Sequence, residues 1–317
     1  LPGTQGLYGF VALFLVLGVF LRNLDRAKKI RWLMAAGAIG LLSLTVVLYL
    51  LGLTGTKYGA ANWLTIAGIS VQPSELAKIC YIFAGAATLD RLFRKRNLGL
   101  FILLTGVCLA CLAYMSDFGT AAIFFVTFLV IAFMRSGSFR TLFLALSAAA
   151  FGAFLILQFR PYVLDRFKGW RHVWEYVNES QGYQQVRVLS YSASGGLFGL
   201  GIGNGKWGGG TSGTSVFAAE SDLVFGMLNE ELGIILAVAV VCILAGLVLY
   251  TRSEATKSRS TFYSICSCSA AAMLLFQACL NIFGSTDVLP LTGVTLPFIS
   301  AGGSSMAAVW GLLAFIK

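Results

Sequence analysis

Long apolar runs separated by short polar connections make up most of the chain. The run Leu232–Tyr250 reads LGIILAVAVVCILAGLVLY, with no charged residue and no alternation of apolar and polar positions. A helix crosses a hydrocarbon core of about 30 Å with about 20 such residues, whereas a membrane barrel needs alternating strands. The pattern therefore predicts an all-α integral membrane protein, a polytopic helical bundle with about nine spans, near residues 7–21, 32–53, 75–90, 98–115, 119–134, 141–158, 223–250, 261–283 and 297–316.

The connections between these spans alternate in charge. The basic ones read RNLDRAKKIR, DRLFRKRN, RSGSFR and TRSEATKSRS, whereas the connections between them have few cations apart from the long segment 159–221. Because basic connections stay on the cytoplasmic side, we place these inside and the segment 159–221 outside. Residue 1 then lies outside, so we expect a further span before Leu1. We treat 1–317 as one transmembrane domain.

Composition agrees with a membrane protein and narrows its partners. Charged residues make up 11% of the chain and hydrophobic residues 58%, whereas a soluble domain carries about 25% charged residues. The net charge of +10 could indicate an anionic partner. The basic connections explain this charge by topology, so we expect the membrane as a partner and no nucleic acid. The single histidine excludes a histidine-based metal site.

The outer segment 159–221 is too long, and too rich in aromatic and charged residues, to be a plain connection. In its first half, Trp170 and Trp174 lie among the basic residues Arg166 and Arg171. This mixture predicts a helix lying in the membrane interface. Simple anchoring and a cationic patch facing lipid phosphates both stay open. The glycine-rich second half lacks the strand and helix that a dinucleotide-binding fingerprint requires. It predicts a re-entrant loop that lines a polar cavity.

Polar groups inside apolar helices are costly, so each needs a reason. Glu75 and Lys78 lie three residues apart on one helix face, where they either neutralise each other or polarise the wall of a cavity. Asp117 is expected at a helix N-terminus, which favours a carboxylate. Asp222 is expected at the outer interface beside the glycine-rich segment. Glu230 follows about two helical turns deeper, either in a contact with another helix or in the same site.

The stretch 288–305, VLPLTGVTLPFISAGGSS, combines prolines, glycines and hydroxyl side chains without a charge. Its glycines let backbones approach closely. Its hydroxyls, Ser300, Ser304 and Ser305 among them, offer neutral hydrogen bonds to a sugar or to the outer segment. The stretch therefore predicts either tight helix packing or an uncharged groove for a lipid tail and a glycan.

Several blocks of the chain together resemble a known family. They are GAANWLTIAGISVQPSELAK, SDFGTA, GYQ, SGGLFGLGIG, SDLVFGMLNEELG and LPLTGVTLPFISAGGSS, in this order and over roughly residues 57–317. These motifs are similar to those of the SEDS family (RodA, FtsW, SpoVE). The resemblance implies a ten-helix fold. It also implies a peptidoglycan glycosyltransferase that polymerises lipid II at the outer face of the bacterial cytoplasmic membrane, for elongation, division or sporulation, with a class B penicillin-binding protein.

The resemblance also implies which residues act. The essential aspartate of the family corresponds to Asp222, which we expect to accept a proton from a sugar hydroxyl. Alternatively it orients that hydroxyl or holds a divalent cation, Mg²⁺ or Mn²⁺. A lipid II flippase and a non-catalytic scaffold of the cell-wall synthesis complex are the rival functions. We expect substrate to be bound by Trp63, Glu75, Lys78, Arg166, Arg171, Arg187, Glu230, Ser300, Ser304 and Ser305, with the lysine and the arginines as candidates for the pyrophosphate.

Overall fold

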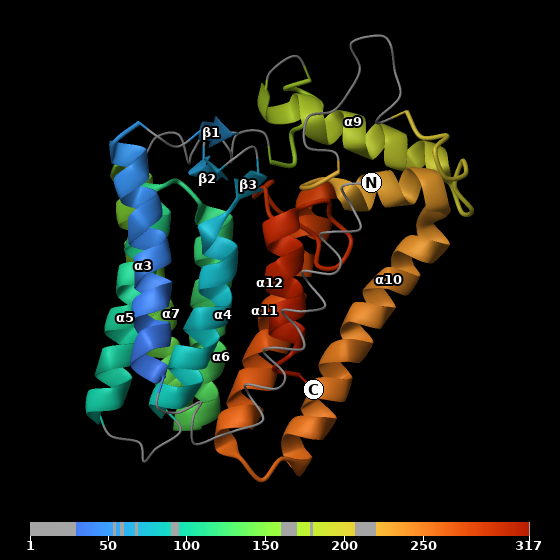
Figure 1. The fold of residues 1–317 in the computed structure, drawn as a ribbon. Coiled ribbons are helices and arrows are strands. Elements are labelled where there is room, and N and C mark those ends of the chain that lie inside the picture. Colours follow the sequence, from blue (N-terminus) through green and yellow to red (C-terminus); the bar gives the residue numbers. More distant parts are fainter. Residues whose placement is uncertain are drawn as a thin grey trace. The chain divides into compact units, whose positions relative to one another are not determined.

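The computed structural model describes residues 30–52, 55–57, 60–66, 69–89, 95–159, 170–177, 180–206 and 220–316. The chain divides into two compact units, and Figure 1 labels the helices and strands from which they are built. Unit 1 is made of Leu1–Leu142, Leu247–Leu274 and Gly302–Lys317, and unit 2 is made of Phe143–Gly246 and Leu275–Ala301.

Unit 1 is built around one helix that is buried along most of its length. This helix, α4 (Pro73–Leu89), packs against α3 (Arg31–Leu50), α5 (Lys95–Tyr114), α6 (Phe118–Ser136) and α12 (Gly303–Leu313). Its small residues allow close approach, and its aromatic side chains fill the remaining space. The Tyr81 ring, for example, packs on the rings of Phe101 and Phe124, and its hydroxyl bonds to the hydroxyl of Thr105 at 2.7 Å.

A small antiparallel sheet lies between α3 and α4 in the sequence. Its strands are β1 (Gly55–Lys57), β2 (Ala60–Ile66) and β3 (Ile69–Val71), in the order β1-β2-β3. Trp63 pairs with Gly55 across the first ladder, and Leu64 pairs with Val71 across the second. We had expected only a connection here. The sheet contacts α3, α4 and α12, so it covers the N-terminal end of α4.

Unit 2 contains α9 (Ser180–Gly195), most of α7 (Phe139–Phe159), the first part of α10 (Val224–Lys257) and the last part of α11 (Thr261–Ser285). The irregular connection 286–302 follows α11. The core of unit 2 is a cluster of apolar side chains from α10, α11 and this connection, namely Val224, Phe225, Ala237, Leu244, Ala278 and Leu296. A second cluster around Val188 and Leu223 joins α9 to the start of α10.

The helical membrane architecture is confirmed. Among the described residues, five helices are long and apolar enough to cross a membrane, α3, α5, α6, α10 and α11. The apolar stretches Phe139–Gly152 and Gly303–Leu313 are shorter. The protein is therefore a multi-pass membrane protein. The expected span 7–21 lies outside the described residues.

The last span was predicted to begin too early. We expected it from residue 297, but α12 begins at Gly303. Pro297 and Phe298, whose φ of 67° is left-handed, hold the chain outside the helical conformation. Gly302 then precedes the helix in an extended conformation. The residues before Gly303 are thus available for contacts of their own.

Helix α10 is broken at Gly233, where φ is 80° and ψ is 168°. The glycine-rich loop 196–206 closes this break with backbone hydrogen bonds. The amides of Leu200 and Gly201 donate to the carbonyls of Glu230 and Glu231 at 2.9 and 3.0 Å. In return, the amides of residues 234 and 235 donate to the carbonyls of residues 196 and 197 at 3.1 and 3.4 Å. We had placed Glu230 by the rise of an unbroken helix, and the break changes the direction of the chain before the apolar span.

The described part of the outer segment 159–221 contains one helix, α9. The interfacial helix that we expected around Trp170 and Trp174 is not seen in 170–177, which forms turns. The remainder of that prediction lies outside the described residues, and so does the expected cavity lining by residues 207–219.

Candidate active site

Asp222 lies in the turn that directly precedes α10, and it is half-buried. A Cβ atom added to Gly293 would lie 3.5 Å from Asp222 Oδ2, so the carboxylate lies against the backbone of the connection after α11. Gly293 has a φ of +70°, a conformation that suits glycine. The nearby N-terminus of α10 favours a negative charge at this place.

The backbone of the turn is held by hydrogen bonds from α11 and from the connection that follows it. The Asn281 Nδ2 group donates to the Asp222 carbonyl at 2.8 Å, and the Ser300 hydroxyl donates to the Ser221 carbonyl at 2.6 Å. The Ala301 amide donates to the Glu220 carbonyl at 2.8 Å. Ser300 therefore uses its hydroxyl within the protein, and its expected contact with substrate stays a prediction.

Glu230 is fully buried near the break in α10. Its Oε1 atom accepts a hydrogen bond from the Lys206 amide at 2.9 Å, and its Oε2 atom is buried without a hydrogen-bond partner among the described residues. Gly205 packs so closely that an added Cβ would lie 3.2 Å from Glu230 Oε2. The described contact of Glu230 is with the glycine-rich loop rather than with another helix, and its place in the substrate site stays a prediction.

Glu75 and Lys78 form the predicted pair in unit 1. Lys78 Nζ donates to Glu75 Oε1 at 2.7 Å, and the two side chains are only 1% and 4% exposed. The second carboxylate oxygen of Glu75 is buried without a hydrogen-bond partner among the described residues. The two charges therefore compensate each other inside the helix bundle.

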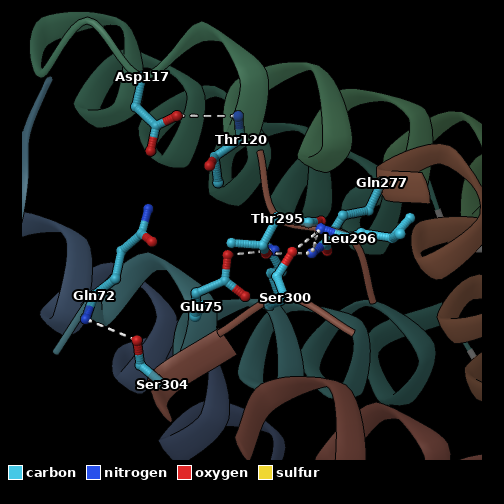
Figure 2. Close-up of polar contacts among 10 residues, drawn as sticks. Gln72, Glu75, Asp117, Thr120, Gln277, Thr295, Leu296, Ser300 and Ser304 are labelled. Carbon is cyan, nitrogen blue, oxygen red and sulfur yellow. Dashed lines mark hydrogen bonds and ion pairs between the residues drawn. The ribbon is translucent and has the colours of Figure 1, made fainter. Parts of the chain in front are cut away.

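A hydrogen bond joins the N-terminal ends of α4 and α12. Figure 2 shows the backbone N–H group of Gln72, one residue before α4, donating a hydrogen bond to the Ser304 hydroxyl at 3.2 Å. Ser305 is buried on the next position of α12. Trp63, on β2, is half-buried. Trp63, Glu75, Lys78, Ser304 and Ser305 thus all belong to unit 1.

The predicted arginines lie on the outer segment in unit 2. Arg187, on α9, is half-buried, and its guanidinium lies 4.4 Å from the centroid of the Tyr183 ring. Arg171 is exposed, and its amide donates to Asp287 Oδ1 at 3.3 Å. Burial raises the pKa of the Asp287 carboxyl above its ordinary value, although the Arg171 amide and the charges of Arg171 and His172 oppose the shift. Arg166 lies outside the described residues.

Asp117 has the capping role that we expected. Its Oδ1 atom accepts a hydrogen bond from the Thr120 amide at 3.1 Å at the start of α6 (Figure 2). The helix dipole and this bond together account for a carboxylate at this position.

Sequence reasoning missed two amides on α11. Gln277 donates to the carbonyl and the hydroxyl of Thr295 at 3.0 and 3.1 Å, as Figure 2 shows. Asn281, one turn later, reaches both Asp222 and Val294. An amide is costly inside an apolar helix unless it is bonded, so the two amides in LLFQACLNIF were a signal that could have been used.

The described residues contain no group of three or more histidine, cysteine, aspartate or glutamate side chains that could hold a metal ion. A divalent cation, Mg²⁺ or Mn²⁺, at Asp222 stays a prediction, because one or two carboxylates together with substrate phosphates can hold such an ion. We derive no step through a metal.

Comparison with known sequences gives one consistent result. The sequence model of FtsW, RodA and SpoVE, described as cell cycle protein, matches residues 3–317. The peptidoglycan glycosyltransferase RodA of Mycobacterium tuberculosis is 27% identical over 322 residues, which cover 96% of this chain and 67% of that protein. The probable peptidoglycan glycosyltransferase FtsW of Bacillus subtilis is 28% identical over 329 residues, which cover 96% of this chain and 77% of that protein.

Solved structures share the fold. A chain from a peptidoglycan synthase complex, in which polymerization and crosslinking are coordinated, aligns with a TM-score of 0.74 at 23% identity and covers 98% of this chain and 87% of that chain. The crystal structure of the Thermus thermophilus rod shape determining protein RodA aligns with a TM-score of 0.67 at 23% identity, covering 98% and 85%.

Proposed function

This chain belongs to the family of FtsW, RodA and SpoVE proteins, and from that premise we propose that it is a peptidoglycan glycosyltransferase. It polymerises lipid II into glycan strands at the outer face of the bacterial cytoplasmic membrane. The observation that carries the proposal is the family match over residues 3–317, together with relatives named for this activity along almost the whole chain.

In the proposed reaction, the 4-hydroxyl oxygen of the acceptor sugar attacks the anomeric carbon of the donor. The bond from that carbon to the pyrophosphate oxygen breaks, and polyprenyl pyrophosphate leaves. The Asp222 carboxylate accepts the proton of the attacking hydroxyl. Its half-buried position at the start of α10, against Gly293, supports this role because the carboxylate has a fixed environment.

The leaving pyrophosphate needs cations beside it. Arg171 and Arg187 are the best supported candidates, because both lie on the outer segment in the same unit as Asp222. Lys78 already has Glu75 as its counterion. Arg166 stays a candidate from sequence.

A class B penicillin-binding protein is part of the proposal as the crosslinking partner. The similar chain from a peptidoglycan synthase complex supports this, since that assembly coordinates polymerization with crosslinking. We place the site on the outer side because the cytoplasmic connections are basic and Asp222 is separated from them by the apolar part of α10.

The test is glycan formation from lipid II by the purified protein in nanodiscs, with and without its partner. Polymer on a gel supports the enzyme. Transport of labelled lipid II between leaflets without polymer would instead identify a flippase, and neither activity would leave a scaffold. A chelator tests whether a metal takes part: loss of polymer with EDTA, restored by Mg²⁺ or Mn²⁺, would show that the reaction needs a divalent cation, and loss of that dependence in Asp222→Asn would assign Asp222 to metal binding.

A further inference from the structure

Three consecutive backbone carbonyls, those of Glu220, Ser221 and Asp222, each accept a hydrogen bond from residues 281–301. The donors are the Ala301 amide at 2.8 Å, the Ser300 hydroxyl at 2.6 Å and the Asn281 amide group at 2.8 Å. All of these residues belong to unit 2. The turn that carries Asp222 is therefore hydrogen-bonded to residues 281–301 through three consecutive carbonyl groups.

Asn281 connects this turn to the chain after α11. Its Nδ2 group divides its two hydrogens between the carbonyls of Asp222 at 2.8 Å and Val294 at 2.7 Å. The side chain is 1% exposed. The Oδ1 atom is buried without a hydrogen-bond partner among the described residues. Because both acceptors are carbonyl oxygens, only the Nδ2 end of the amide can face them, so the side chain fixes the spacing between the turn and residue 294.

Ser300 fixes the other side in a similar way. Its hydroxyl oxygen accepts a hydrogen bond from the Leu296 amide at 2.7 Å, which closes the local chain into a turn (Figure 2). The same hydroxyl then donates to Ser221. The irregular stretch before α12, including the left-handed Phe298, is thus folded into the shape that presents Ser300.

Resting on the proposed function, we infer that Asn281 and Ser300 are positioning residues that hold the Asp222 carboxylate in its reactive orientation. The peptide groups on both sides of the Asp222 Cα atom are then constrained. The Gly293 backbone lies beside the carboxylate, since a Cβ atom added to Gly293 would be 3.5 Å from Asp222 Oδ2. The two donors are neutral and bind backbone carbonyls, so they orient the base without placing a cation beside it.

Their removal should lower turnover more than substrate binding. A misplacement of about 1 Å costs up to roughly 100-fold in rate, so we expect Asn281→Ala and Ser300→Ala each to reduce kcat about 10- to 100-fold, with KM changed less than about 3-fold. Ser300→Thr keeps the hydroxyl and should restore most of the turnover. A direct contact of Ser300 with substrate would instead raise KM.

The matched control is Gln277→Ala. Gln277 is also a buried amide on α11, one turn before Asn281, and it donates to Thr295. The Gln277→Ala variant should lose about as much thermal stability as Asn281→Ala does, while its kcat falls less than about 3-fold. Equal losses of kcat in the Gln277 and Asn281 variants would overturn the inference, because they would show a structural role only.

A second measurement does not depend on polymerisation. Amide hydrogen exchange in the peptide around residues 220–226 should become at least about 10-fold faster in Asn281→Ala than in Gln277→Ala. Unchanged exchange would overturn the positioning role even if the protein is an active enzyme. Full activity of Asp222→Asn would instead refute the assigned base and leave the exchange result to decide whether the turn is held.

Discussion

At the scale of single residues, the buried charged side chains of the protein have partners within the fold. Glu75 and Lys78 form an ion pair, and the Glu230 carboxylate accepts a hydrogen bond from the backbone amide of Lys206. The first pair was predictable, because a spacing of three residues on a helix brings opposite charges together. The partner of Glu230 was not predictable, because it comes from a loop 24 residues earlier in the chain.

Breaking the buried pair should be costly. Glu75→Gln removes the charge that lies 2.7 Å from the Lys78 ammonium, which is 1% exposed, and we expect a loss of about 3–5 kcal/mol in the free energy of unfolding. Thermal unfolding in detergent or nanodiscs measures it. The control is Glu254→Gln, which breaks the exposed pair with Lys257 at the same spacing and the same 2.7 Å. Similar losses in both variants would contradict the assigned importance of burial.

The Asp287 carboxyl should give a pH-dependent stability. Its pKa is raised by burial, so the folded protein binds this proton more tightly than the unfolded chain does. The contribution is present at low pH and is lost as pH rises through the raised pKa. The melting temperature of Asp287→Asn should therefore equal that of wild type at low pH and exceed it at neutral pH. A difference that shrinks with rising pH would contradict the direction of the shift.

At the scale of elements, the positions of the helices were predictable and their irregularities were not. The apolar runs placed α3, α5, α6 and α11 within a few residues. Gly233 sits inside the run LGIILAV, which reads as ordinary helix. Its break depends on the loop 196–206, which offers backbone groups in place of the helical ones. The sheet β1-β2-β3 was likewise hidden, since short strands in an outer connection leave little periodic signal.

The glycine-rich loop should not accept side chains where it touches α10. An added Cβ on Gly199 would lie 2.2 Å from the Glu231 carbonyl oxygen, at a φ of +78°. Gly199→Ala should therefore destabilise the protein beyond the roughly 1–3 kcal/mol expected for backbone strain alone. Gly203→Ala is the control, because its φ is +79° and nothing lies within 4 Å of its added Cβ. Equal melting temperatures for the two variants would refute the close packing of loop and helix.

At the scale of the whole molecule, the charge pattern of the connections predicts which side each connection faces. Asn204, in the glycine-rich loop, and Ser258, in the basic connection after α10, are both exposed. In a background without the seven native cysteines, which are free thiols, Asn204→Cys should react with a membrane-impermeant maleimide on intact cells. Ser258→Cys should react only after the cells are opened. The reverse pattern would place the site in the cytoplasm.

The family and the fold class were predictable from the whole chain because the motifs occur in a fixed order and the apolar runs are long. The support of Asp222 was not, because it comes from Asn281 and Ser300, which follow the aspartate by 59 and 78 residues and meet it only in the folded chain. Local patterns identify the reactive side chain, and long-range contacts show what holds it.

The most direct measurement is the rate of glycan synthesis from lipid II by wild type and by Asp222→Asn, each with the proposed class B penicillin-binding partner. Thermal unfolding confirms that both proteins are folded. The account predicts glycan chains from wild type and a loss of at least about 100-fold in kcat in the variant, because the amide cannot accept the proton. Turnover of the variant close to that of wild type would contradict the role of Asp222 on which the proposed mechanism rests.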